Sequence, residues 1–67
     1  MKIGHLYFLI VDPPAVDLPS HYLVRIFELN NKEVTGNYLY KRNDETWSDD
    51  WLIGLFDIDK IIVCKEL

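Results

Sequence analysis

The segment YLVRIFELNNKEVTGNYLYK, residues Tyr22–Lys41, decides the fold that the sequence predicts. Aromatic and β-branched residues dominate two runs, Tyr22–Leu29 and Val34–Lys41, and alternate side chains of each run would point to opposite faces, as in strands. Between the runs lies Asn30–Glu33, and asparagine tolerates the left-handed backbone angles of a tight turn. We therefore predict an antiparallel hairpin over residues 22–41.

The N-terminal part of the chain reads as one more strand and a loop. The run Ile3–Val11 is almost continuously apolar, which favours a strand that is covered on both faces. Asp12-Pro13-Pro14 ends this run, and Pro19-Ser20 precedes the hairpin. Because proline lacks an N–H and fixes its own φ, neither site fits a central strand, so residues 12–20 are predicted to form a loop.

The C-terminal part leaves one alternative open. Arg42–Asp50 is polar except for Trp47 and reads as a second loop. Ser48 could cap a helix, which the following aspartates would favour through its dipole, so one short helical turn near residues 49–55 is possible. A short strand over Trp51–Phe56 fits almost as well, because Gly54 disfavours a helix.

After a turn at residues 57–60, the β-branched run Lys60–Cys64 is predicted to form the last strand. The sequence thus predicts a mainly β fold, with a single small domain over residues 1–67 that forms a small antiparallel barrel or bent sheet of four or five strands. A domain of this size buries only about 60% of its unfolded surface. The 49% hydrophobic content excludes disorder, and a single cysteine, Cys64, excludes a disulfide scaffold.

The opening Lys2-Ile3-Gly4-His5-Leu6-Tyr7 resembles the first strand of SH3-like small barrels. A longer loop, a hairpin, a polar loop with an aromatic residue and a short last strand then follow in the order of that plan, over most of the chain. The tyrosine and proline signature of the members that bind proline-rich peptides is not recognisable here. The resemblance therefore implies an SH3-like architecture and no activity. The residues that could supply an acidic loop and paired aromatics are Asp17, Tyr40, Asp44, Glu45 and Trp47.

Charge is concentrated in one segment. The chain carries a formal charge of −4, whereas residues 43–59 hold six carboxylates and no Lys or Arg, and also contain Trp47 and Trp51. Acidic patches steer encounters with basic surfaces, and tryptophan is a common interface anchor. We expect Trp47 to be the exposed anchor and Trp51 to lie in the core; the alternative is a solvated loop whose tryptophans fill the core. The candidate partner-binding residues are Asp44, Glu45, Trp47, Asp49, Asp50, Asp57 and Asp59.

The predicted function is a stand-alone, non-catalytic protein-binding module that docks onto a basic surface of a larger protein. One alternative is an acidic inhibitor, of the kind that phages and plasmids carry, that mimics nucleic acid against a nucleic-acid-binding enzyme. The other is a structural subunit or homodimer that pairs through a strand edge. No enzyme is expected, because Cys64 lies in an apolar run that would bury its thiol and no glycine-rich phosphate loop is present.

No cofactor or metal is expected either. The carboxylates do not match a calcium loop, and His5, His21 and Cys64 do not make a four-ligand zinc site. The acidic balance disfavours direct nucleic-acid binding, although Lys41 and Arg42 beside two tyrosines could stack bases. The longest uncharged apolar stretch, six residues over Leu6–Val11, is far below the roughly 20 that a membrane span needs. With no signal peptide recognisable, a cytoplasmic location is predicted.

Overall fold

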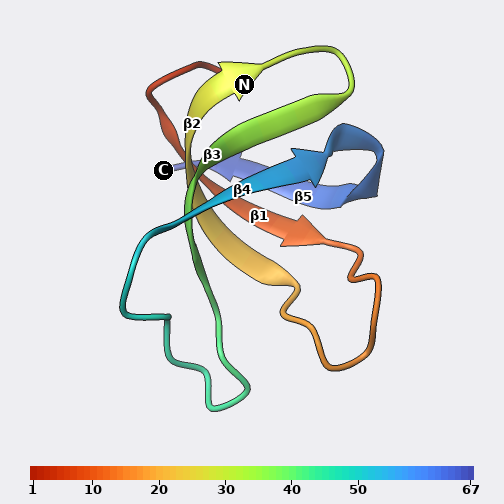
Figure 1. Ribbon diagram of the computed structural model, residues 1–67, viewed down its shortest axis with the longest axis vertical. Coiled ribbons are helices and arrows are strands. Elements are labelled where there is room, and N and C mark those ends of the chain that lie inside the picture. Colours follow the sequence, from red (N-terminus) through yellow and green to blue (C-terminus); the bar gives the residue numbers. More distant parts are fainter.

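A computed structural model describes all of residues 1–67, which form one five-stranded antiparallel sheet. The sheet curls strongly, so that its two edge strands lie on either side of a concave interior (Figure 1). This confirms the predicted mainly β fold and the bent sheet. The elements are β1 (Leu6–Val11), β2 (His21–Leu29), β3 (Glu33–Tyr40), β4 (Leu52–Asp57), the 3-10 turn η1 (Ile58–Lys60) and β5 (Ile61–Glu66). The strands lie in the sheet in the order β4-β3-β2-β1-β5.

The predicted hairpin is present as β2 and β3, which pair from Tyr22 opposite Tyr40 to Leu29 opposite Val34. The side chain of Asn30 closes its turn, because its Oδ1 accepts hydrogen bonds from the backbone N–H groups of Lys32 at 2.8 Å and Glu33 at 2.9 Å. A short polar side chain that bonds the backbone two and three residues ahead is a local turn signal, and it fixes where the strands reverse.

The alternative of a helical turn near residues 49–55 is wrong, since β4 is extended and pairs with β3 along its whole length. A strand at this position covers the edge of β3, whereas a helix would have left that edge unpaired and would have placed Gly54 in its interior. The one helical turn is η1, which links β4 to β5. No helix in the structure is long and apolar enough to cross a membrane.

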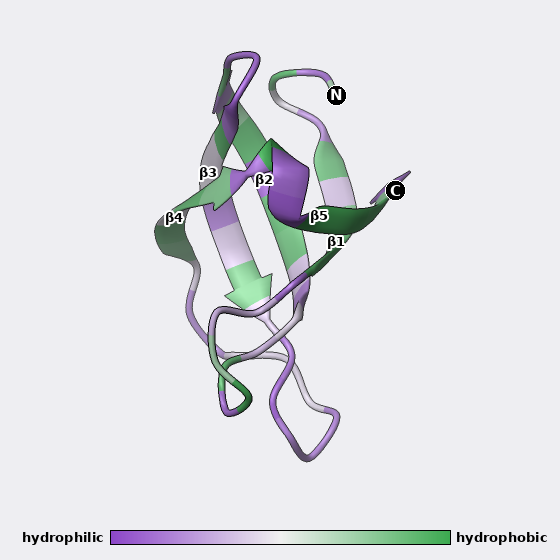
Figure 2. Cartoon of the chain, turned by 90° about the vertical axis from the view of Figure 1, so that its right-hand side faces the viewer, coloured by the Kyte–Doolittle hydropathy of each residue, from purple (hydrophilic) through white to green (hydrophobic).

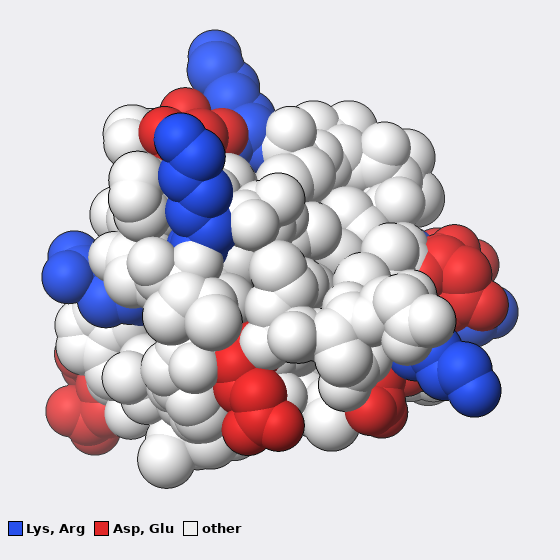
Figure 3. All heavy atoms as spheres, turned by 90° about the horizontal axis from the view of Figure 1, so that it is seen from above, with Lys and Arg blue, Asp and Glu red and all other residues white.

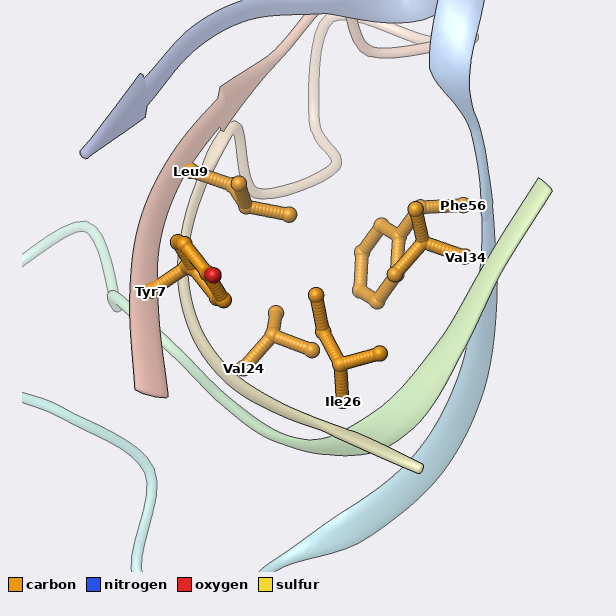
Figure 4. Packing of buried hydrophobic residues seen from close by; sticks show 6 residues of the cluster. All are labelled: Tyr7, Leu9, Val24, Ile26, Val34 and Phe56. Atoms are coloured by element: carbon orange, nitrogen blue, oxygen red, sulfur yellow. The ribbon is translucent and has the colours of Figure 1, made fainter. Parts of the chain in front are cut away.

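The core lies on the concave face of the sheet. Alternate side chains of β1, β2, β3 and β4 point into it from all around the curve (Figure 4). This inward set is small, and the remaining partly buried apolar residues pack around it. The six buried apolar residues are Tyr7, Leu9, Val24, Ile26, Val34 and Phe56.

Two glycines face each other across β3 and β4 and permit close approach at the bend. A Cβ on Gly36 would lie 2.4 Å from the carbonyl oxygen of Arg25, and a Cβ on Gly54 would lie 2.5 Å from the ring of Tyr38. Tyr38 therefore lies directly over the backbone of β4. Its ring meets those of Tyr22 and Phe56 edge to face, with centroids 5.6 Å and 5.5 Å away.

Replacing Gly36 by alanine should destabilise the protein, because the neighbour of the new methyl group is backbone and cannot move cheaply. We expect Gly36→Ala to lower the free energy of unfolding by about 1–3 kcal/mol, the usual cost of overpacking. Urea unfolding at fixed pH measures the change. The neighbouring Asn37→Ala, on the other face of β3, serves as the control; equal midpoints for the two variants would contradict the packing described here.

Candidate protein-binding site

The segment between β3 and β4, residues 41–51, is an ordered extension of the sheet. Lys41 and Trp47 form an isolated antiparallel bridge. The backbone N–H of Ser48 donates to the carbonyl oxygen of Tyr40 at 2.8 Å, and the hydroxyl of Ser48 accepts from the N–H of Tyr40 at 3.0 Å. This closes the base of the loop, so the carboxylates beyond it are held by a fixed backbone.

Arg42 organises the inside of this loop. Its guanidinium donates to the hydroxyl of Thr46 at 3.1 Å and to the carbonyl oxygen of Trp47, and it lies 3.1 Å from a carboxylate oxygen of Asp49. Lys41 pairs with Glu45 at 2.8 Å. Two of the four loop carboxylates are thus paired with cations that stand just before the acidic segment in the sequence.

Asp44 and Glu45 form the tip of the loop, and the pKa of each carboxyl is lowered from its ordinary value. Asp44 accepts hydrogen bonds from the hydroxyl of Thr46 at 2.6 Å and from its backbone N–H at 3.1 Å, which lower the pKa of this carboxyl. The pKa of Glu45 is lowered chiefly by its hydrogen bond and charge interaction with Lys41. Glu45 also has a positive φ of 71°, so the backbone turns sharply at this residue.

The predicted acidic segment does not form one surface. The loop gathers Asp44, Glu45, Asp49 and Asp50, whereas Asp57 is the last residue of β4, a strand of six residues that spans roughly 20 Å, and Asp59 follows it in η1. Asp57 and Asp59 border a surface hollow beside Lys32 and Glu33. Figure 1 shows the loop and η1 far apart, and in Figure 3, which looks at the end opposite the loop, acidic and basic groups are interspersed around a neutral centre.

The two tryptophans have the opposite of their predicted roles. Trp47 is half-buried, and its ring meets that of Phe8 edge to face at 6.5 Å, whereas Trp51 is 51% exposed. The prediction of Trp47 as exposed anchor and Trp51 as core residue is therefore wrong. The signal that was missed is strand parity: Phe56 points inward, so the side chains of Leu55, Ile53 and Trp51 fall on the outer face.

The thiol of Cys64 is exposed, so the expectation that an apolar run would bury it is also wrong. Cys64 lies opposite Leu9 on β5, which is an edge strand with no neighbour to cover it. Desolvation raises the pKa of the Cys64 thiol, which keeps it protonated near neutral pH. No group of three or more His, Cys, Asp or Glu side chains is placed to hold a metal ion.

No protein-family model, curated protein or solved structure matches this chain. The site is therefore interpreted from its own residues. What the geometry brings together is a hydrogen-bonded loop with exposed carboxylates and an exposed tryptophan directly after them.

The burial of Trp47 and the exposure of Trp51 predict different fluorescence emission from the two rings. In Trp51→Phe the remaining Trp47 should emit at shorter wavelength and be weakly quenched by acrylamide, because Phe8 and the loop cover it. In Trp47→Phe the remaining Trp51 should emit at longer wavelength and be strongly quenched. Emission spectra and quenching constants of the two folded variants check this, and the reverse order would refute the placement of the two rings.

The hydrogen bonds to Asp44 predict a pH effect. Because the folded pKa of Asp44 lies below its unfolded value, its ionisation stabilises the fold above the unfolded pKa, and this contribution is lost as the pH falls through the folded pKa. Thr46→Val removes the hydroxyl donor, so the pKa of Asp44 should rise toward its ordinary value. Carboxyl chemical shifts in an NMR titration measure the pKa of Asp44, with Thr35→Val as the control. An unchanged pKa in Thr46→Val would contradict the Thr46 hydroxyl as the cause of the lowered value.

Proposed function

We propose that this chain is a non-catalytic protein-binding module, and that the loop of residues 41–51 docks onto a basic surface of a larger partner. The observation that carries the proposal is Trp51, which stays half exposed directly after two exposed carboxylates, Asp49 and Asp50. An exposed tryptophan loses much hydration on burial in a partner and is a frequent source of interface energy. Carboxylates beside it favour a partner that is positively charged.

The docking surface of this proposal consists of Asp44, Asp49, Asp50 and Trp51. Glu45 is paired with Lys41 and holds the turn at the tip of the loop, whereas Asp49 pairs with Arg42 but stays 88% exposed beside Trp51 in the sequence. Trp47 supports the loop from beneath by packing on Phe8. The hydrogen bonds of Arg42 and Ser48 fix the backbone in advance, which reduces the entropy that binding would cost. Asp57 and Asp59 fall outside this surface because they lie at and after the far end of β4.

The pairing of Lys41 and Arg42 with two of the carboxylates favours docking over mimicry of nucleic acid. A mimic must present several unpaired negative charges to a site that binds several phosphates, and only two of the four carboxylates of this loop are free of ion pairs.

A likeness to SH3-like barrels belongs to the same proposal. The strand order and the 3-10 turn before the last strand support it. The lone, exposed thiol of Cys64 supports a reducing, cytoplasmic setting.

The charge part of the proposal is tested with matched pairs of substitutions. Asp49→Asn/Asp50→Asn removes two charges from the docking surface, whereas Asp57→Asn/Asp59→Asn removes two from the other end of β4. Partners captured from the native host by the wild type should be recovered by the second variant and lost with the first. Loss of the Asp49 and Asp50 charges should also lower the association rate at low salt and make that rate less dependent on salt concentration.

The anchor is tested with Trp51→Ala, which should abolish capture while leaving the thermal unfolding midpoint almost unchanged, since the side chain is half exposed. Recovery of the same partners by Asp49→Asn/Asp50→Asn and by Trp51→Ala, at wild-type yield, would overturn the proposed function.

A further inference from the structure

Strand β4 is an open edge of the sheet that lacks the usual protection. Its single neighbour is β3, and the pairing between them shows no register shift, so no bulge interrupts the edge. Its first five residues, Leu52–Phe56, contain no charge and no proline. Natural edge strands normally carry such features, because a regular apolar edge is a template for pairing with another chain.

The side chains of β4 are as unprotected as its backbone. Ile53 is 74% exposed, Leu55 is 55% exposed and Leu52 is 43% exposed. In Figure 2 the strand runs along the margin of the molecule as a hydrophobic band. The opposite edge differs, because β5 carries Lys65 and Glu66 and its pairing with β1 shifts register.

A groove on the concave side of β4 adds a second, independent feature. It has a volume of about 380 Å³ and lies between the chain after β1, at Pro13 and Pro14, and the C-terminal half of β4. The rings of Tyr22, Tyr38 and Phe56 line it and contact one another edge to face. An apolar side chain that entered beside Phe56 would cover these rings.

We propose that β4 pairs antiparallel with β4 of a second copy of this chain, about a two-fold axis at Gly54. In this register Gly54 faces its own copy, Ile53 faces Leu55 of the second copy, and Phe56 faces Leu52. Opposite residues in an antiparallel pair project to the same face, so each Leu52 enters the aromatic groove of the other copy. The interface is isologous and closed, as in most homodimers.

The self-complementarity of the strand selects a second copy as the occupant. Within Leu52–Phe56 no polar residue faces an apolar one, and at the ends of the register Asp57 faces Trp51, so no two carboxylates oppose each other within the strand. Like charges directly opposite each other would destabilise such a pair, and this strand avoids them although the whole chain is acidic. Of the loop surface the proposed register involves Trp51 alone, and the proposal needs no other protein for its test.

Sedimentation velocity of the wild type from micromolar to millimolar concentration is the first test, and a concentration-dependent dimer is expected. Ile53→Lys/Leu55→Lys places like charges opposite each other twice and should raise the dimer dissociation constant roughly tenfold or more. Ile53→Glu/Leu55→Glu should do the same. Mixing the two variants should restore a dimer, because each lysine then faces a glutamate.

Ile62→Lys/Val63→Lys makes the matched change on the β5 edge, at residues that are also exposed, and should leave dimerisation unchanged. Circular dichroism confirms folding of each variant. A wild type that stays monomeric throughout, a β5 variant that abolishes association, or open-ended oligomers in place of dimers would overturn the proposal. Failure of the mixed variants to associate would overturn the register at Gly54.

Discussion

The curvature of the sheet is the constraint on which the rest of this structure depends. Five short strands have no second layer to cover them, so the sheet must enclose its own concave face to exclude water from any core. That requires β2, β3 and β4 to bend together. Gly36 and Gly54 face each other at the bend, where a Cβ would meet backbone on one strand and an aromatic ring on the other.

A core enclosed in this way is small, and this determines what the surface looks like. Six apolar side chains are buried, although hydrophobic residues make up 49% of the chain. The surplus has to lie on the convex face and along the edges. Trp51, Ile53 and Leu55 belong to this surplus, and their exposure follows from their parity on β4, opposite to that of the buried Phe56. Both proposed interaction surfaces are thus consequences of enclosing a core with a single short sheet.

The strands and the hairpin turn could be predicted from the sequence because their signals are local. Asn30 bonds the backbone of its own turn, and the prolines at 13, 14 and 19 stand in the loop where they end or precede strands. The roles of Trp47 and Trp51 could not be predicted, because both rings are near in sequence and only the pairing with β3 and the position of Phe8 separate them. The division of the acidic segment could not be predicted for a related reason. The two cations that pair with half of the loop carboxylates stand just before residue 43, and β4 separates Asp57 and Asp59 from the loop.

Limited stability connects the loop surface and the open edge. A domain of this length buries little surface, so its free energy of unfolding is small, and ligands or partners that bind only the folded state raise it by mass action. Pairing at β4 would supply the edge of the sheet with the hydrogen bonds and side-chain contacts that the chain cannot provide for itself. The loop of residues 41–51 has its own internal hydrogen bonds and ion pairs and does not depend on that pairing. The two surfaces share Trp51, which the proposed register places opposite Asp57 of the second copy, and otherwise differ. The loop is held by its own contacts before it meets a partner, whereas β4 gains its missing neighbour from a second copy.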